Sequence, residues 1–454
     1  MLEKFGELIV TSSDFMWGIP VLVLLLGGGF YFLVITRLAP IKYIGHAIQI
    51  IRGKYDDPNE AGQLKHYQAL STALAGTVGM GNISGVAVAI TMGGPGAIFW
   101  MWISALLGVS TKFFTCSLAV MYRGKDSAGE IQGGPMYVIT EGLGRRWKPL
   151  AIFFSVMAML GVLPIFQSNQ LTQVIRDVFL VPNGIHRSVM TDMIIGSVMA
   201  IIVAIVVLGG VKRLGNVTGR MVPVMVVVYI VAVLYIIFSH PSEIIPSFRL
   251  IFEDAFTGKA VVGGSLGAII ITGVRRAAFS NEAGMGTAPM AHGAAKTNEP
   301  IREGLVAMLG PIIDTIIVCT MTALAIIITG VWTHSSSDGI TLTAEAFNDA
   351  IPYGSYVLLV CVIFFSLSTM FAFPYYGSKC LSFVAGAKYQ HLYHYFVVVL
   401  VVVGAVSQMR VIVAFIDLAF ALMAFPTMIS ALLLSGKVRR AAVDYFRRYK
   451  AGEF

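Results

Sequence analysis

The chain has 454 residues, of which 12% are charged and 57% are Ala, Val, Ile, Leu, Met, Phe, Trp, Tyr or Cys. Soluble domains carry about twice that share of charged residues, so the composition excludes an ordinary soluble enzyme, a disordered protein and a secreted disulfide scaffold. The mean hydropathy of +0.80 indicates an integral membrane protein built from helices. The net charge of +8 would suit a nucleic-acid-binding protein, but the placement of the basic residues argues against that function.

Apolar segments long enough to cross the roughly 30 Å hydrocarbon core of a bilayer recur along the whole chain. The first covers residues 17–36, and an amphipathic stretch at 41–52 follows it, which we expect to lie in the membrane interface. Ten further spans are expected at 68–91, 96–121, 149–180, 189–209, 216–239, 261–291, 303–331, 354–378, 390–408 and 411–435. Residues 1–14 do not resemble a signal peptide, because they hold one lysine and precede an overlong apolar run without a cleavage site.

Most of the 32 lysines and arginines fall on one side of this arrangement. With the N-terminus outside, the inside segments hold 25 of them and the outside segments hold five. Such an excess is typical of cytoplasmic loops, so we expect a multi-pass protein of the plasma (inner) membrane with its N-terminus outside and its C-terminus cytoplasmic. Topology and anionic lipid therefore account for the positive charge, which makes the bilayer a partner and excludes nucleic acid.

Two of the expected spans are interrupted by glycines. Residues 71–85 read STALAGTVGMGNISG, with four glycines within ten residues and Asn82 among them. Each interior glycine costs about 1 kcal/mol of helix propensity, so we expect this segment to unwind. Unwound backbone at membrane depth offers amides and carbonyls to a substrate and an ion. Close packing of small residues is the alternative interpretation.

A second interrupted span, residues 263–289, lies five helices later and mixes glycines with polar residues. Interruptions at matching places in two five-helix halves are typical of an inverted-repeat transporter. The string GGSLG at 263–267 also matches the nucleophile elbow of hydrolases, but it opens a membrane span and lacks His and Asp partners. We therefore do not expect an enzyme.

Other spans carry polar side chains that are candidates for function. Ser366, Ser368 and Thr369 either complete an oxygen shell for a small cation or bond back to carbonyls of their own helix. Gln167 interrupts a long apolar run and is a plausible substrate contact.

Ionisable residues inside spans are functional candidates by default. We favour a structural role for Lys112 and leave Asp314 and Asp417 open between proton site, substrate partner and structural ion pair. Glu282 is expected at the cytoplasmic end, where capping or gating suits it better than binding.

Four long motifs resemble those of the alanine or glycine:cation symporter family: GGPGAIFWMWISALLG at 93–108, FSNEAGMGTAP at 279–289, GNISG at 81–85 and YYGSKC at 375–380. The resemblance runs nearly end to end. It implies an all-α polytopic membrane protein with the LeuT-type fold, in which two inverted five-helix repeats follow one extra leading helix, about 11 transmembrane helices in all. The implied divisions are 1–66 for the leading helix and interfacial helix, 67–240 and 241–440 for the repeats, and 441–454 for a cytoplasmic basic tail.

The same resemblance implies symport of a small neutral amino acid, alanine or glycine, with Na⁺. The alternative is H⁺ coupling, or transport of glutamine or another neutral amino acid. Carried over to this sequence, the substrate site comprises Thr77, Gly79, Gly81, Asn82, Gln167, Thr272, Gly273 and Phe279. The Na⁺ site comprises carbonyls of Ala75, Val78 and Phe365 with hydroxyls of Ser368 and Thr369. Five oxygens suit Na⁺ without a carboxylate, so Na⁺ is the expected co-transported ion; no organic cofactor or obligate protein partner is expected.

Three positions depart from the family pattern. Met80 stands where many members have Thr, Ala277 where Gly is usual, and Gly293 where Ala usually follows the histidine. The first two lie close enough to the expected pocket to question the alanine or glycine preference, and they leave open a larger neutral amino acid such as glutamine. Residues 341–350 are expected to form a short outer helix that acts as a lid.

Overall fold

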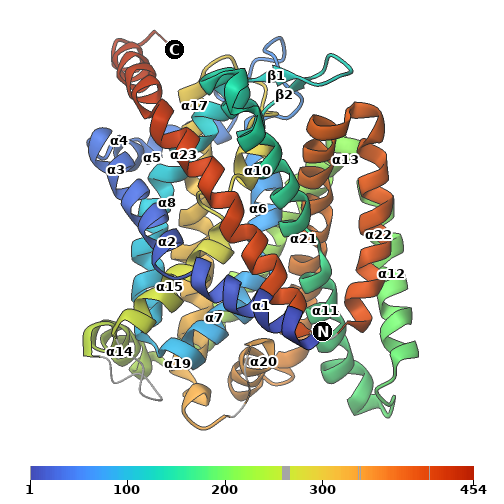
Figure 1. Ribbon diagram of the computed structural model, residues 1–454. Coiled ribbons are helices and arrows are strands. Elements are labelled where there is room, and N and C mark those ends of the chain that lie inside the picture. Colours follow the sequence, from blue (N-terminus) through green and yellow to red (C-terminus); the bar gives the residue numbers. More distant parts are fainter. Residues whose placement is uncertain (1, 258–265, 336, 338, 408, 454) are drawn as a thin grey trace.

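The computed structural model describes residues 2–257, 266–335, 337, 339–407 and 409–453, and these residues form an all-α bundle (Figure 1). Within them, nine helical segments are long and apolar enough to cross a membrane, and one bent pair of shorter helices makes a tenth span. The strand pairing described there is a short antiparallel hairpin, β1 (Gly124–Lys125) with β2 (Ile131–Gln132). The expected class of fold, a polytopic helical membrane protein, is confirmed.

The leading segment packs against the C-terminal helix. Its elements are α1 (Leu2–Met16), α2 (Ile19–Leu22), η1 (Val23–Gly27), α3 (Gly28–Ile35), α4 (Ala39–Lys42) and α5 (Ile44–Ile51). The Trp17 indole donates to the carbonyl of Asp417 at 2.8 Å, and His46 Nε2 lies 2.8 Å from the Tyr445 hydroxyl. The first membrane-length segment begins at Gly6, earlier than residue 17, because the helical register extends through the polar N-terminal residues.

The first interrupted span breaks where its glycines cluster. The first half contains α6 (His66–Thr77), α7 (Met80–Gly93), α8 (Gly96–Met121), α9 (Pro135–Tyr137), η2 (Val138–Leu143), η3 (Arg145–Trp147), α10 (Lys148–Gly161), α11 (Ile165–Val174), η4 (Ile175–Leu180), η5 (Val181–Asn183), α12 (Val189–Val207) and α13 (Gly210–Ser239). Helices α6 and α7 meet at an angle of 42° across Val78 and Gly79. The expected unwinding is therefore present, although it is confined to two residues.

The second half begins with η6 (Pro241–Glu243), α14 (Ile244–Thr257), α15 (Leu266–Asn281), α16 (Thr287–His292), α17 (Pro300–Ala307), α18 (Leu309–Pro311), η7 (Ile312–Cys319) and α19 (Thr320–Ile328). It ends with η8 (Val331–Thr333), α20 (Gly339–Ala350), α21 (Gly354–Ala385), η9 (Ala387–Tyr389), α22 (Gln390–Val406) and α23 (Met409–Lys450). The segment 441–454, expected as a tail, continues α23 as far as Lys450. Part of the GGSLG string lies outside the described residues.

The second interrupted span breaks between α15 and α16, at residues 282–286. Glu282, Gly284 and Gly286 all have positive φ, at 54°, 89° and 98°, so the chain leaves the right-handed helix here. A Cβ on Gly286 would lie 2.6 Å from both Phe154 Cε2 and Thr427 Oγ1. This glycine is therefore required both for its backbone conformation and for the close approach of its neighbours.

We expect Gly286→Ala to lower the midpoint of thermal unfolding, because it adds about 1–3 kcal/mol of backbone strain and a further steric cost of similar size. Gly184→Ala is the matched control, since Gly184 has φ 81° but open space around its Cβ position. Scanning fluorimetry in detergent at a fixed heating rate measures both variants. Equal shifts would contradict the steric part of this explanation.

Candidate functional site

A narrow cavity of about 20 Å³ lies beside the α6–α7 break. Its wall comprises Gly76, Thr77, Gly79, Met80, Gly81, Leu163, Phe166, Gln167, Phe279, Glu282, Thr369, Phe373, Ile416 and Phe420. These residues come from both interrupted spans and from α11, α21 and α23. Five of the predicted substrate residues line it, namely Thr77, Gly79, Gly81, Gln167 and Phe279.

Part of the cavity lining is polar. Thr77 Oγ1 and Gln167 Oε1 are buried and have no hydrogen-bond partner among the described residues. Buried polar atoms are nearly always paired in proteins, so two such atoms on one cavity wall indicate a polar ligand. The Glu282 side chain, 3% exposed, adds a carboxylate that accepts a hydrogen bond from the Thr287 hydroxyl.

The rest of the lining includes aromatic rings and a methionine. The Phe279 ring lies 5.8 Å from the Phe166 ring, nearly perpendicular to it, and 5.9 Å from the Phe420 ring. Met80 is 1% exposed and lines the same cavity. The lining therefore combines unpartnered polar atoms with apolar side chains, a composition that suits a ligand with a polar head and an uncharged side chain.

Asn82 does not line the cavity, but its hydrogen bonds stabilise the break between α6 and α7. Its Oδ1 accepts a hydrogen bond from the Gly79 amide at 2.8 Å, across the unwound residues. Its Nδ2 donates to Asp314 Oδ1 at 2.7 Å and to Ser280 Oγ at 3.1 Å. Asp314 also accepts hydrogen bonds from Ser280 Oγ at 2.6 Å and Thr315 Oγ1 at 2.8 Å. Both carboxylate oxygens of Asp314 therefore accept hydrogen bonds, and this network holds Asn82 in place.

Thr272 and Gly273, also predicted as substrate residues, do not line the cavity. Both lie within α15, which remains helical there, and the break follows about two turns later. A Cβ on Gly273 would lie 2.7 Å from Trp100 Cβ, and a Cβ on Gly93 would lie 3.2 Å from Thr272 Cγ2. These two residues let α15 pack closely on α8 and the end of α7.

The predicted ion ligands are all buried and lie next to the break: Ala75, Val78, Phe365, Ser368 and Thr369. Ser368 Oγ and Thr369 Oγ1 donate to the Phe365 carbonyl, at 2.8 and 3.2 Å. A Cβ on Gly79 would lie 2.5 Å from Thr369 Oγ1, so the unwound residues face these hydroxyls. Both sequence interpretations of the hydroxyls are compatible with this geometry, because a hydroxyl that donates to a carbonyl keeps lone pairs for a cation.

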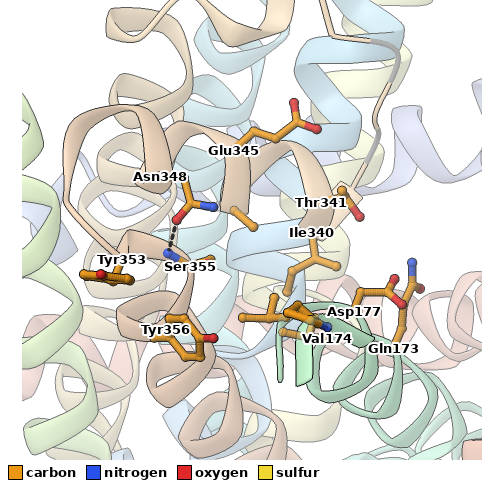
Figure 2. A pocket seen from close by; sticks show the side chains of 13 residues that line it. Gln173, Val174, Asp177, Ile340, Thr341, Glu345, Asn348, Tyr353, Ser355 and Tyr356 are labelled. Atoms are coloured by element: carbon orange, nitrogen blue, oxygen red, sulfur yellow. Dashed lines mark hydrogen bonds between the residues drawn. The ribbon is translucent and has the colours of Figure 1, made fainter. Parts of the chain in front are cut away.

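A second pocket opens between the end of α11 and helix α20 (Figure 2). Gln173 and Asp177 line one side of it, and Glu345 and Asn348 from α20 line the other. The Ser355 amide donates to Asn348 Oδ1 at 2.7 Å, which holds α20 against the start of α21. The expected short helix at 341–350 is therefore present within α20, and it borders a pocket.

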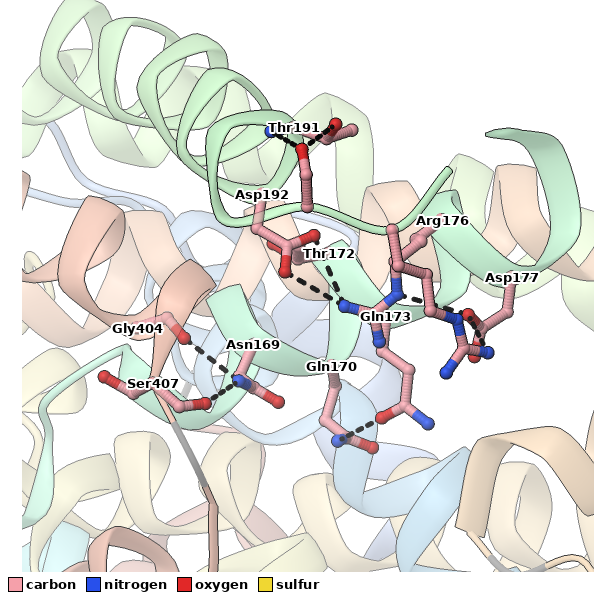
Figure 3. Close-up of polar contacts among 12 residues, drawn as sticks. Asn169, Gln170, Thr172, Gln173, Arg176, Asp177, Thr191, Asp192, Gly404 and Ser407 are labelled. Carbon is pink, nitrogen blue, oxygen red and sulfur yellow. Dashed lines mark hydrogen bonds and ion pairs between the residues drawn. The ribbon is translucent and has the colours of Figure 1, made fainter. Parts of the chain in front are cut away.

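Polar side chains on α11 connect the two cavities. Gln167 lines the buried cavity, Gln173 lines the outer pocket, and Gln170 lies between them on the same helix. Gln170 Nε2 donates to Gln173 Oε1 at 3.3 Å (Figure 3), and Ser84 Oγ on α7 donates to Gln170 Oε1 at 3.4 Å. We name Gln167, Gln170 and Gln173 the glutamine stripe. Sequence reasoning selected only its first member, although the three-residue spacing was a visible signal.

The end of α11 is fixed by an ion-pair cluster. Arg176 pairs with Asp192 at 3.0 Å and with Asp177 at 3.2 Å (Figure 3). Arg187 also contacts Asp177, at 3.0 Å. This cluster joins the helix that carries the glutamine stripe to the start of α12.

Two further charged residues that the sequence singled out, Asp417 and Lys112, lie among contacts that hold helices together. Asp417 forms an ion pair with Arg275 at 2.8 Å, and Arg275 also pairs with Asp14 at 3.0 Å, which ties α15 to α1 and α23. Lys112 is 1% exposed, and its Nζ would lie 3.0 Å from a Cβ on Gly310. Both residues therefore fit structural roles.

Glu282, expected at the cytoplasmic end in a capping or gating role, lines the buried cavity. Its position in the second interrupted span was the available signal. Of the three departures from the family pattern, Met80 lines the cavity, whereas Ala277 is buried outside the wall. Gly293 packs against Gly133, where a Cβ would lie 2.6 Å from that residue's Cα.

The fold and the cavity together define a helical membrane transporter, with a polar cavity between two interrupted spans. A family model described as "Sodium:alanine symporter family" matches residues 2–454, and the chain belongs to this family. It is 39% identical over 442 residues to a sodium/alanine symporter, AgcS, of Methanococcus maripaludis, which covers 96% of each chain.

Two other comparisons place the chain among known transporters. It is 32% identical to the probable sodium/glutamine symporter GlnT of Bacillus subtilis, covering 100% of this chain and 93% of that one. The crystal structure of MhsT in complex with L-phenylalanine aligns with a TM-score of 0.59 at 11% identity, covering 83% of this chain and 90% of MhsT. This likeness confirms the LeuT-type fold expected from the sequence.

We expect Asn82→Ala to lower the thermal unfolding midpoint of the purified protein, because it leaves the buried Gly79 amide and part of Asp314 without partners. Each such loss costs about 1–3 kcal/mol. Thr91→Ala is the control on the same helix, since its hydroxyl bonds only to the Val88 carbonyl, at 3.2 Å. A variant of Asn82 as stable as the control would show that the break does not depend on this side chain.

Proposed function

We propose that the protein couples Na⁺ influx to the uptake of a small neutral amino acid, alanine or glycine, by alternating access. The observation that carries this proposal is the pair of unpartnered buried atoms, Thr77 Oγ1 and Gln167 Oε1, in a cavity beside an unwound segment. A carboxylate of the substrate accepts hydrogen bonds from the Thr77 hydroxyl and from backbone amides of the first turn of α7, and its ammonium group faces the Glu282 carboxylate.

Na⁺ binds between the α6–α7 break and α21. The donor set is the carbonyl oxygens of Ala75, Val78 and Phe365 with the hydroxyls of Ser368 and Thr369, the oxygen ligands that a hard monovalent cation prefers. Bound Na⁺ fixes the unwound backbone and so orients the amides for the substrate. Because the coupling free energy is shared, the amino acid raises the affinity for Na⁺ by the same factor.

The orientation follows from the basic residues. We propose that the N-terminus faces outside and the C-terminus the cytoplasm, in the inner membrane, since lysine and arginine concentrate in alternate connections. The pocket beside α20 then opens to the outside, and substrate enters along the glutamine stripe. Helix α20 acts as the lid over this route.

An H⁺-coupled mechanism is the second candidate, and Glu282 favours it, because a buried carboxylate on the cavity wall can carry a proton. The other alternative is a substrate larger than alanine or glycine. Met80 lines the cavity and would set the size of the substrate that fits there, and the relative GlnT is described as a probable sodium/glutamine symporter.

We expect proteoliposomes to take up labelled alanine or glycine under an inward Na⁺ gradient and to show counterflow. Thr369→Val should raise the Na⁺ concentration for half-maximal uptake by about tenfold or more, since a ligand oxygen is lost. Ser378→Ala is the matched control on α21, because its hydroxyl donates to the Tyr375 carbonyl at 2.9 Å and it lies about two and a half turns beyond Thr369. Equal Na⁺ dependence of both variants would refute the ion site, and uptake driven only by a proton gradient would refute Na⁺ coupling.

The variant Glu282→Gln distinguishes Na⁺ coupling from H⁺ coupling. If Na⁺ is the driving ion, this variant should keep its Na⁺ dependence while the KM for the amino acid rises, since the ammonium group loses a charged partner. If protons drive uptake, the variant should lose acceleration by an inward pH gradient. The test measures initial uptake rates with each gradient imposed alone, with wild-type protein as the reference.

A further inference from the structure

A groove of about 620 Å³ lies between the first half of α13 and helix α21. Six of its seven lining residues lie on α13 between Arg213 and Val224, and the seventh is Phe364 of α21. Five of the seven are exposed, so the groove is open to the surroundings of the protein. It shares no lining residue with the cavity beside the α6–α7 break or with the pocket beside α20. The groove is therefore a separate feature, and the proposed substrate and ion sites do not include its residues.

The groove carries positive charge without an acidic partner. Arg213 and Arg220 line it from positions seven residues apart, so their side chains lie on the same face of α13. Arg213 Nη1 donates to the Ile205 carbonyl at 2.8 Å, and within the described part of the chain neither guanidinium forms an ion pair. The sequences of α13 and α21 contain no Asp or Glu. Neither helix therefore supplies a group that would neutralise these two charges.

The position of Arg220 along its helix makes an anionic partner valuable. Arg220 lies about 15 Å along the helix axis from Gly210, where the membrane-length helix α13 begins. A charged side chain inside a span is costly unless it pairs or reaches the interface. A guanidinium pairs especially well with phosphate, to which it donates two parallel hydrogen bonds. The phosphate of a membrane lipid is an anion that the bilayer itself brings to this helix.

The rest of the groove is mostly apolar. Val217, Met221 and Val224 line it from α13, and Phe364 lines it from α21. Val224 is 61% exposed and Phe364 is 41% exposed. From Arg213 to Val224 the helix rises about 16 Å, roughly half of the hydrocarbon thickness of a bilayer. A matching ligand therefore has an anionic group at the level of the arginines and a hydrocarbon chain that extends toward the middle of the span.

Asn216 adds a neutral donor and connects the groove with α6. Its Oδ1 accepts a hydrogen bond from Gln68 Nε2 at 2.9 Å, which leaves its Nδ2 available to a phosphate oxygen. The Tyr67 hydroxyl of α6 also donates to the Gly219 carbonyl, at 2.5 Å. A ligand in the groove would therefore rest on the helix that supports the first interrupted span.

We propose that this groove binds an anionic phospholipid, with its phosphate between Arg213 and Arg220 and one acyl chain extending toward Phe364. Basic pockets between transmembrane helices near the cytoplasmic face are typical sites for such headgroups. With the proposed orientation, α13 begins at the cytoplasmic face, so the lipid belongs to the inner leaflet. The site does not depend on which solute or ion is transported.

The affinity for lipid tests the site directly. Native mass spectrometry of the detergent-purified protein, titrated with phosphatidylglycerol or with phosphatidylcholine of the same chains, gives the dissociation constant of the first bound lipid. We expect phosphatidylglycerol to bind the wild-type protein at least fivefold more tightly than phosphatidylcholine. The variant Arg213→Gln/Arg220→Gln should weaken binding of phosphatidylglycerol about tenfold and leave binding of phosphatidylcholine unchanged.

The matched control is Arg439→Gln/Arg440→Gln, which removes the same charge from exposed positions on α23 that do not line the groove. Equal loss of affinity in both double variants would overturn the proposal, because net charge alone would then attract the lipid. Displacement of the lipid by an equal concentration of inorganic phosphate would also overturn it, because the groove would then be a site for a soluble anion.

A second pair of variants tests the apolar part of the groove without changing its charge. Val224→Trp should fill the groove beside Phe364 and weaken binding of phosphatidylglycerol at least fivefold, because the acyl chain loses its place. Val231→Trp is the control, since Val231 is 60% exposed, lies two turns further along the same face and does not line the groove. Equal affinities of these two variants would overturn the proposal, and this comparison remains available if the double arginine variant does not fold.

Discussion

The structure depends on one constraint, that backbone amides and carbonyls inside a bilayer must find partners within the protein. An unbroken helix satisfies this rule automatically, whereas this chain breaks two spans. At the first break the Asn82 side chain accepts the bond from the Gly79 amide, replacing a partner that the helix no longer supplies. Asp314 and Ser280 then hold Asn82 in place, so one network crosses from the first repeat to the second.

The cavity depends on this replacement of a helical hydrogen bond by the Asn82 side chain. The hydrogen-bond network around Asp314 holds the break in place on one side. The other side of the break is therefore available to line the cavity, together with Gln167, Glu282 and the aromatic rings. The close approach of Gly79 to Thr369 brings the same two residues of backbone against the hydroxyls of α21. The proposed substrate and ion sites would therefore share the unwound segment, which gives a direct physical route for coupling between them.

Sequence reasoning located these features unevenly. The glycine cluster at 76–85 predicted the first break because helix propensity is a local property. The second break was harder to place: Thr272 and Gly273 looked like an interruption, but tight packing on α8 uses their small size within a continuous helix. Glu282 was expected in a capping or gating role, and the sequence did not indicate that it lines the cavity, because the backbone turn with positive φ at 282 is formed only in the folded structure. The pairing of His66 and His292 through Glu303 joins residues more than 200 positions apart, and no local pattern reveals it.

The glutamine stripe has a consequence for inhibition. Three amide side chains at a regular spacing lead from the buried cavity to the pocket beneath α20, and each offers both a donor and an acceptor. A blocker built on an amino-acid head, with a polar chain reaching along Gln170 to Gln173, would occupy both cavities at once. With the proposed orientation and with α20 as the proposed lid, it would compete with substrate from the outer face and keep α20 from closing, so a non-transported ligand of this shape would arrest the protein in a single conformation.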